Sequence, residues 1–337
     1  MIVKRNIATI AILLCICAVV VACKNTATPE TKPGADNKNE EKVFTAPDTS
    51  KIPHDDFGNM VRYGRDLIVN TAYYLGPNGT KGHYLGNKMN CTNCHLDAGT
   101  RPFAFNFFST YGRYPQYRGR ENKVLTVQER VNNCIERPHS GTPMPLDKRE
   151  MVAITCYIKW VGSNVPVGHH VHGDETLEIT YPGRPADPLR GAALFAENCS
   201  SCHGKDGQGQ WNADSSTYTY PPLWGPHSYQ KGSSPHRVLK IARFIKGNMP
   251  DKKAFWSKPY LTDDQCIDIA AFINDDRIHD RPEKKDKANP DYPEIRTKPI
   301  DYATGPFIDT FSAQQHKFGP YQPIIDYHKA HNLPVIF

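Results

Sequence analysis

Apolar side chains recur along this chain with the spacing of helices rather than of strands. Within residues 55–75, Met60, Tyr63, Leu67 and Ala72 fall near one face of a predicted helix. The same spacing predicts further helices in 126–135, 147–161, 234–247 and 262–273, and one that starts at 187. We therefore expect an all-α fold with loop-rich connections.

Several predicted helices begin with recognisable start signals. Three have a capping-box pair, in which the first side chain and one three positions later bond each other's backbone: Thr126 with Glu129, Asp147 with Glu150, and Thr262 with Gln265. Asp187-Pro188 places proline at a first helical position, where its missing N–H costs nothing.

The N-terminus has the pattern of a secretion signal rather than of a fold element. Two cations precede an apolar run at 7–21, and small residues then lead to Cys23. This pattern predicts a lipoprotein signal peptide over 1–22, with lipid attached to Cys23 after cleavage. Residues 23–50 are polar and predict a flexible tether. We expect the protein to be exported to the periplasmic side and anchored to a membrane through this lipid.

Composition narrows the class of protein further. Gly and Pro account for 24 and 28 of the 337 residues, and 39% of residues are hydrophobic. These values exclude a multispanning membrane protein and fit a loop-rich globular chain. Lys and Arg exceed Asp and Glu by 41 to 35, a net charge of +6 that falls to +4 without the two signal-peptide cations. This excess is too small to indicate nucleic-acid binding.

Two cysteine motifs of the same form carry the chemistry. Cys91-Thr92-Asn93-Cys94-His95 and Cys199-Ser200-Ser201-Cys202-His203 both follow C-x-x-C-H, the pattern of covalent haem c attachment. The two thiols add to the haem vinyl groups, and the histidine binds the iron. We predict two covalently bound haem c groups, with His95 and His203 as iron ligands.

Each motif lies between predicted helices in the same order, which indicates two tandem cytochrome c domains. We predict a first domain at 51–163, a linker at 164–186, a second domain at 187–280 and an irregular C-terminal arm at 281–337. The arm is rich in proline and in short polar runs, and its role is not evident from the sequence.

The second axial ligand of each iron is less clearly marked. In the second domain the candidate is Met249, which follows a predicted helix; Met/His ligation raises the reduction potential. In the first domain there are two candidates, Met144 and Cys134. Met144 is the positional counterpart of Met249, so spacing alone favours it, whereas Cys134 lies on the predicted helix 126–135.

A family resemblance favours the cysteine. The chain contains, in order, GRYPQYRGR, RVNNCIERPHSGTPMPLDKREMVAITCYIKW, PPLWGPHSY, FIKGNMP, DQCIDIAAFIN and TGPFIDTFSAQQHKFGP. With these segments the chain resembles the thiosulfate dehydrogenase family of dihaem cytochromes c over residues 55–323. The resemblance implies that Cys134 is the distal ligand of the first haem and Met249 that of the second.

The resemblance also implies a reaction, the oxidative joining of two thiosulfates to tetrathionate, which some members run in reverse as tetrathionate reductases. Electrons would pass from a His/Cys haem to a His/Met haem and then to a periplasmic partner such as a small cytochrome c. Arg120 and Arg130, with Lys246 from the second domain, are expected by similarity to hold the dianions near Cys134. Arg130 lies one helical turn before Cys134, on the same face.

Two other functions are compatible with two haems. A non-catalytic electron-transfer lipoprotein would need no cation-lined pocket. A dihaem cytochrome c peroxidase would need an open peroxide site with acid–base residues. We further hypothesise that the Cys134 sulfur carries a transient sulfur adduct during turnover.

Overall fold

The computed structural model describes residues 42–285 and 290–337. The predicted signal peptide, Cys23 and most of the predicted tether lie outside the described residues. Within these described ranges, no helix combines the length and apolar character needed to cross a bilayer.

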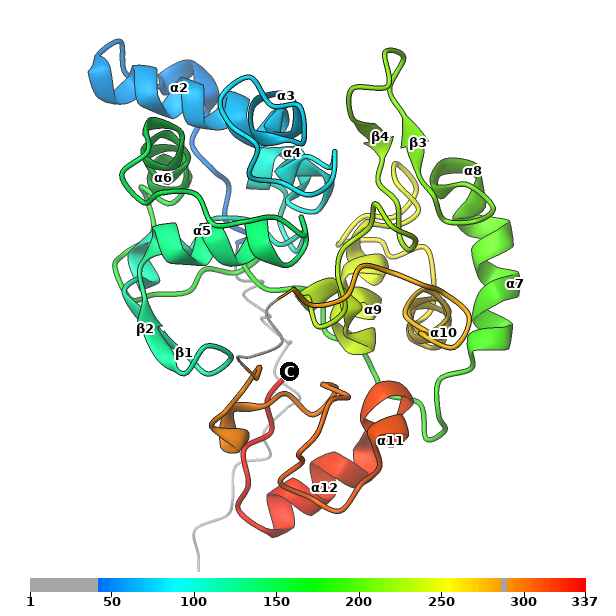
Figure 1. Ribbon diagram of the computed structural model, residues 1–337. Coiled ribbons are helices and arrows are strands. Elements are labelled where there is room, and N and C mark those ends of the chain that lie inside the picture. The colour runs from blue at the N-terminus through cyan, green and yellow to red at the C-terminus, as the bar shows by residue number, and fades with distance from the viewer. Residues whose placement is uncertain (1–41, 286–289) are drawn as a thin grey trace, which may run out of the picture. The chain divides into compact units, whose positions relative to one another are not determined.

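Helices make up most of the regular structure, and each of the two sheets is a short antiparallel hairpin (Figure 1). The elements up to the linker are η1 (Thr49–Lys51), α2 (Asp56–Val69), α3 (Thr71–Leu75), η2 (Cys91–Asn93), α4 (Leu96–Gly99), η3 (Tyr111–Arg113), β1 (Gln116–Arg118), β2 (Lys123–Leu125), α5 (Val127–Glu136) and α6 (Arg149–Val161). Those that follow are α7 (Pro188–Asn198), α8 (Ser200–His203), β3 (Gln210–Trp211), β4 (Tyr218–Tyr220), η4 (Ser234–His236), α9 (Val238–Asn248), α10 (Asp263–Ile273), η5 (Ile295–Thr297), α11 (Ala313–Phe318) and α12 (Gln322–Ala330).

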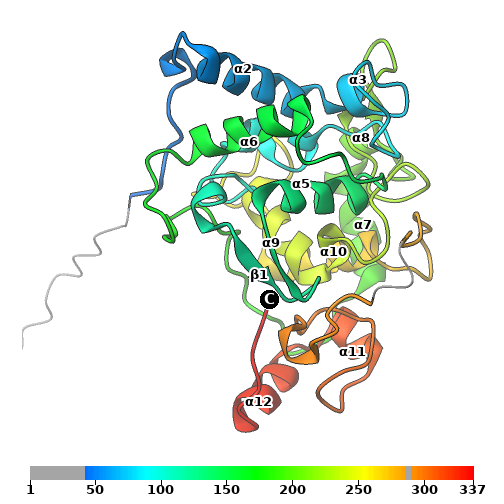
Figure 2. The same ribbon diagram turned by 60° about the vertical axis from the view of Figure 1, so that its left-hand side comes forward.

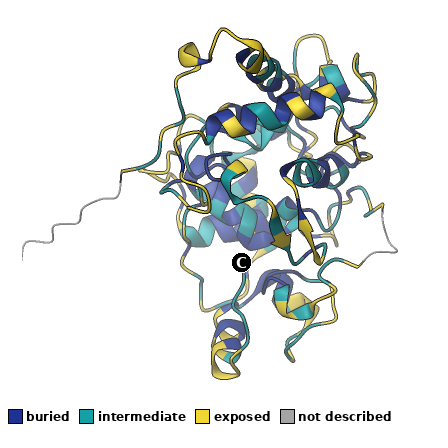
Figure 3. Cartoon of the chain, turned by 90° about the vertical axis from the view of Figure 1, so that its left-hand side faces the viewer, coloured by how far each residue is buried: buried dark blue, intermediate teal, exposed yellow. Residues whose placement is uncertain are grey.

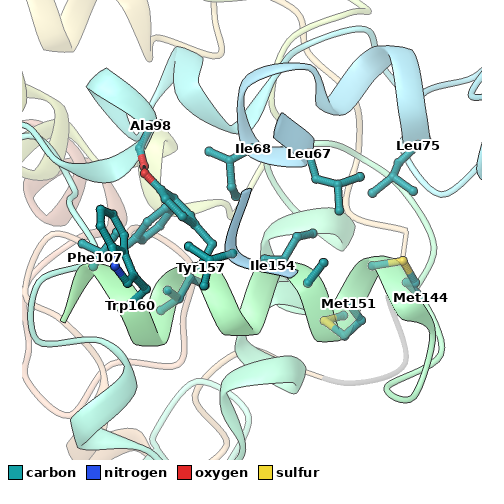
Figure 4. Packing of buried hydrophobic residues seen from close by; sticks show 14 of the residues in the cluster. Leu67, Ile68, Leu75, Ala98, Phe107, Met144, Met151, Ile154, Tyr157 and Trp160 are labelled. Atoms are coloured by element: carbon teal, nitrogen blue, oxygen red, sulfur yellow. Dashed lines mark hydrogen bonds between the residues drawn. The ribbon is translucent and has the colours of Figure 1, made fainter. Parts of the chain in front are cut away.

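The core around the first motif forms where α2 crosses α6. Leu67 of α2 packs with Ile154 and Tyr157 of α6, and all three are almost fully buried (Figure 4). A Cβ atom on Gly64 would come within 2.0 Å of a carbonyl oxygen of α6, so only glycine permits this approach of the two helices. The Tyr157 hydroxyl donates to the Ala98 carbonyl at 2.9 Å, which ties this core to the segment after the first motif.

A second core repeats this arrangement around the second motif, where α7 crosses α10 and α9 packs alongside. A Cβ atom on Gly191 of α7 would come within 2.0 Å of the Asp268 carbonyl oxygen of α10. The fully buried Asp268 carboxylate pairs with Arg184 at 2.9 Å and Arg190 at 3.1 Å. The predicted all-α class with two helical domains is therefore confirmed. Figure 3 shows that the helices of both domains carry buried and exposed residues together.

Proline starts α7 after the Asp187 cap as predicted, whereas the predicted capping boxes are correct in two cases and wrong in one. Thr126 and Thr262 each form the predicted capping box. The box predicted for Asp147 is absent among the hydrogen bonds of the described residues, because α6 begins only at Arg149. The carboxylate of Glu150, its predicted partner, instead accepts from the Tyr63 hydroxyl at 2.8 Å and pairs with Lys148 at 3.2 Å.

Two predicted helices are interrupted. The stretch 55–75 divides at Asn70 into α2 and α3. The stretch 234–247 starts as the 3-10 turn η4, and α9 begins only at Val238 because Arg237 has an extended backbone.

The C-terminal arm is less irregular than expected. Its helices α11 and α12 lie together at one end of the ribbon (Figures 1 and 2). Pro323 falls in the first turn of α12, where proline is tolerated, so it does not break the helix. The arm has its own buried contacts, in which Tyr321 and Ile324 pack against Leu239 of α9.

The end of the predicted tether is also more ordered than expected. Phe44 packs against Phe108 with ring centroids 4.9 Å apart, and its N–H donates to the His172 carbonyl at 2.9 Å. The expectation of flexibility up to residue 50 is therefore wrong for this part. Val43-Phe44, an apolar pair in a polar segment, was the signal in the sequence.

Candidate active site

The second motif opens onto a cavity that is partly open to solvent. Cys199 follows α7, and the remainder of the motif forms α8. The His203 Nδ1–H donates to the Pro221 carbonyl at 2.8 Å, which leaves Nε2 as the ring nitrogen available for a metal. Met249 ends α9 in an extended conformation and packs against the second core.

The cavity has a volume of 300 Å³ and mostly apolar walls. Its lining includes both cysteines of the second motif, His203 and Met249, together with Ile241, Ile245, Ile269 and Ile273. Cys94, from the first motif, lines the same cavity. One attachment cysteine of the first motif and both of the second therefore line one cavity.

The first motif holds its histidine in the same way. The His95 Nδ1–H donates to the carbonyl of Phe105, a residue in the left-handed conformation with φ +51°. The Phe105 ring stacks on Phe244 of α9 with centroids 4.8 Å apart and planes 16° apart. The backbone that orients His95 is therefore packed against the helix that ends at Met249.

Cys134 on α5 completes the first centre. Its thiol lies close enough to interact with the His95 ring, and the Arg130 guanidinium donates to its Sγ at 3.0 Å through Nη1. Burial opposes the thiolate, but the charges of Arg130 and Arg137 and the contact with His95 outweigh it and lower the pKa of Cys134 to about 6. The helix geometry predicted for Arg130 and Cys134 is observed directly.

Met144, the alternative that spacing favours, lies elsewhere. Its side chain is 1% exposed and packs in the first core beside Leu75 and Met151 (Figure 4). Its backbone N–H and C=O both bond the Asn132 side chain at 2.9 Å. These bonds hold Met144 in a structural position.

Two further arginines, Arg137 and Arg120, lie near the C-terminal end of α5. The Arg137 Nη1 pairs with the Glu121 carboxylate at 2.9 Å, and both side chains are largely buried. Arg137 follows Cys134 by three residues, and this helical spacing is the feature of the sequence that indicates its place near Cys134. The predicted Arg120 is 7% exposed, and none of its guanidinium nitrogens has a hydrogen-bond partner within 42–285 or 290–337.

Of the predicted cations, Lys246 is the one that the structure does not bring to this centre. Its Nζ lies 2.7 Å from the Asp263 carboxylate and donates to the Glu178 carbonyl at 2.7 Å. Lys240 on the same helix instead lies over the Phe105 ring, with its Nζ 5.2 Å from the centroid. Burial, together with the neighbouring charges of Arg237, Arg243 and Arg130, lowers the pKa of Lys240 to about 8. Helical pattern alone does not distinguish these two lysines, since neither is on the apolar face of α9.

These donors fit a covalently attached haem at each motif. Each motif offers two thiols and an imidazole whose Nδ1 is already bonded to a carbonyl. His95 and Cys134 would hold one iron, and His203 and Met249 the other. The soft thiolate and thioether sulfurs, together with imidazole, suit iron in a haem.

Comparison with known proteins agrees with this arrangement. Residues 84–167 match the SoxA/TsdA cytochrome c domain, and residues 186–273 match the family of cbb3-type cytochrome c oxidase subunit III. These two matches cover the first and second motifs, respectively. The protein therefore has two cytochrome c domains with covalently bound haem c.

Relatives that match most of the chain show which family of cytochromes it belongs to. The thiosulfate dehydrogenase of Stutzerimonas stutzeri is 35% identical over 72% of this chain and 74% of its own. That of Psychrobacter arcticus is 36% identical, covering 71% of this chain and 70% of its own. The structure of thiosulfate dehydrogenase TsdBA from Marichromatium purpuratum is similar, with a TM-score of 0.66 and 32% identity over 73% of this chain. The match spans 51% of the length of that TsdBA chain. With two haem motifs, a cysteine facing the first histidine and these relatives, the chain belongs to the thiosulfate dehydrogenase family.

Proposed function

We propose that this protein oxidises thiosulfate by joining two molecules to tetrathionate. The observation that carries the proposal is the Arg130–Cys134 contact of 3.0 Å beside His95. A sulfur ligand next to a guanidinium puts a redox-active position and an anion-binding group in one place. A haem protein that only carried electrons would not need this arrangement.

The charges around Cys134 suit two dianions. Two thiosulfates repel each other strongly in a partly desolvated site, so the site must supply fixed positive charge. Arg130 and Arg137 lie on either side of Cys134 along α5, and Arg120 offers unused N–H donors. Lys240 adds a cation from the second domain.

The reaction balances without proton transfer. The terminal sulfurs of the two thiosulfates form one S–S bond, and two electrons are released. When bound, each haem accepts one electron at a time, which matches a two-electron reaction to one-electron carriers. His95 with Cys134, and His203 with Met249, are the residues that would hold them. The shared cavity that Cys94 and Cys199 line supports a short path between them.

We further propose that Cys134 reacts covalently. Its Sγ would form an S–S bond to the terminal sulfur of the first thiosulfate as two electrons leave. The second thiosulfate would then attack that sulfur and release the Cys134 thiolate. A Cys134→Ser variant that retains both haems but loses turnover is expected; full turnover would contradict this role.

The activity is tested by following ferricyanide reduction with thiosulfate and by identifying tetrathionate as product. Running the assay with reduced viologen and tetrathionate tests reversal. A pure electron carrier would be inactive in both directions, and a peroxidase would consume peroxide instead. Near-infrared magnetic circular dichroism of the oxidised protein distinguishes thiolate from Met ligation at the first haem.

Export, lipid attachment at Cys23 and a small periplasmic cytochrome c as electron partner are parts of the same proposal. The sequence of residues 1–23 supports export and lipid attachment, and the electron partner is proposed from the family resemblance. Incorporation of labelled fatty acid into the wild-type protein, but not into a Cys23→Ser variant, is the expected result.

A further inference from the structure

The C-terminal arm reaches the first domain at the β1–β2 hairpin. The Tyr292 N–H donates to the Arg120 carbonyl at 3.0 Å. Beside it, a Cβ atom on Gly119 would come within 2.3 Å of the Thr297 side chain, so the hairpin needs glycine where η5 rests on it. These contacts fix the arm against the turn between β1 and β2.

Two arm tyrosines also enclose the Arg120 side chain. The Arg120 Cζ lies 5.3 Å from the Tyr292 ring centroid and 5.4 Å from that of Tyr302. The two rings meet edge to face, 4.9 Å apart, and so form a corner around the guanidinium. Asp291 is the nearest carboxylate, at 4.0 Å from Arg120 Nε, and it already accepts from the Tyr302 hydroxyl and pairs with Lys284.

The backbone of Tyr292 indicates that this corner is built at some energetic cost. Tyr292 has φ +57°, a left-handed conformation that aromatic residues rarely adopt. Strained residues of this kind persist where surrounding structure holds them, and they concentrate at functional sites. Here the strained residue bonds the Arg120 backbone and stacks on its side chain.

We propose that the arm is a positioning element, in which Tyr292 and Tyr302 hold Arg120 so that its N–H groups are presented to an anion at the first centre. This inference rests on the proposed function, which makes that anion thiosulfate. Aromatic rings attract a guanidinium through its flat faces and do not use its in-plane donors. A buried carboxylate in the same place would consume those donors, and Arg120 could not then bind a second anion.

The test compares four tyrosine variants in the holoprotein. Tyr302→Leu and Tyr292→Leu are expected to raise the KM for thiosulfate about tenfold, with a smaller change in kcat. Tyr292→Phe keeps its ring and leaves the Tyr302 hydroxyl bonded to Asp291, so its KM is expected to stay near that of the wild type. Tyr327→Leu, which removes an arm aromatic packed on Phe311 instead, is the matched control and should leave KM unchanged.

Two outcomes would overturn the inference. Equal KM values for Tyr302→Leu and Tyr327→Leu would make the arm merely structural, and a Tyr292→Phe variant as impaired as Tyr292→Leu would exclude the ring as the cause. The dissociation constant of thiosulfate, followed by the haem spectrum of the oxidised protein, should rise in parallel with KM in Tyr302→Leu.

A further measurement distinguishes the anion that Arg120 serves. If the variants shift the midpoint potential of the first haem without thiosulfate and leave thiosulfate binding unchanged, Arg120 serves the haem carboxylates and the inference is wrong. If the wild type binds thiosulfate spectroscopically but does not oxidise it, the proposed function fails while the binding comparison still tests the arm.

Discussion

The two haem centres of this protein are alike around the histidine of the C-x-x-C-H motif and different around the second candidate ligand. In both, a C-x-x-C-H histidine donates its Nδ1–H to a backbone carbonyl, from Phe105 in the first and Pro221 in the second. Opposite His95 lies a cysteine bonded by an arginine, whereas the second centre has Met249 in a mostly apolar cavity.

The difference shows how one fold can be used for two tasks. The repeated part, including the glycine-mediated helix crossing, attaches and orients the cofactor. The variable part is the distal side, where arginine can bind an anion beside Cys134 at one centre and the thioether of Met249 lies in a mostly apolar cavity at the other. Chemistry is therefore expected at the first centre and onward electron transfer at the second.

Of the changes predicted here, removing the Arg130 charge at the first centre should have the largest effect on activity. In Arg130→Met, kcat/KM for thiosulfate should fall about 100-fold, because truncating one partner of a buried charged pair costs about 3 kcal/mol. Steady-state ferricyanide reduction measures this. Arg149→Met, at an exposed position at the start of α6, is the control and should change kcat/KM little. If both variants lowered kcat/KM equally, the Arg130 charge could not be what distinguishes the first centre from the second.

The two helix crossings provide a comparison of the domains themselves. Ile154→Ala and Ile267→Ala each truncate a buried side chain in one core, at 2% and 0% exposure. Each should lower the free energy of unfolding by about 3 kcal/mol. Denaturant titration followed by circular dichroism tests this. A much smaller loss in one variant would show that its core is looser than the other.

Exchanging methionines sharpens the assignment of the second centre. Met249→Leu should lower the midpoint potential of one haem and leave the KM for thiosulfate unchanged, since the thioether acts only on the second iron. Met144→Leu preserves the core volume and should leave both potentials unchanged, at a stability cost below about 1.5 kcal/mol. Spectroelectrochemical titration distinguishes them. A shift of the first haem's potential in Met144→Leu would contradict Cys134 as its ligand, and unchanged potentials in Met249→Leu would contradict Met249 as the ligand of the second haem.

The smallest effect concerns pH and the contact between the second domain and the arm. Burial lowers the pKa of His236 to about 4, against opposing effects from Asp276 and further lowering by Lys317 and Arg281. As the pH falls, His236 is therefore protonated in the unfolded chain before it is protonated in the folded chain. The contribution of His236 to the free energy of unfolding is complete above pH 6.5 and is lost as the pH falls towards 4. From pH 7 to 5 the loss due to His236 is about 2 kcal/mol.

A His236→Gln variant tests that sign. The fall in unfolding free energy between pH 7 and 5 should be smaller in the variant than in the wild type. The buried His139 and the half-buried His279 also have lowered pKa values of about 4 and will leave part of the dependence in place. An unchanged slope in the variant would show that His236 is not the group responsible.

Much of the fold was predictable because it depends on local signals. Helical spacing and two capping boxes gave the helices, and C-x-x-C-H gave both attachment sites. The failures have a common cause: Asp147, the tether end and the arm helix α12 depend on partners distant in sequence. Glu150, for example, is bonded by Tyr63 rather than by the helix start.

The residues of the candidate site also divide into those that local spacing predicts and those that depend on contacts distant in sequence. Arg130 and Cys134 share one helix, so their contact follows from spacing. Lys240 rather than Lys246 faces the first centre because of how α9 packs on the Phe105 segment, which spacing within α9 does not reveal. The arm tyrosines around Arg120 are more than 170 residues from it, and no pattern in the sequence links them.

Phe105 connects the two centres in a way that neither electron flow nor substrate binding requires. Its carbonyl sets how strongly the His95 ring donates to a bound metal, because the hydrogen bond to Nδ1 governs the basicity of the opposite nitrogen. Its ring rests on α9, the helix that ends at Met249. Packing on α9 therefore joins the residue that ends this helix, Met249, to the backbone that orients His95.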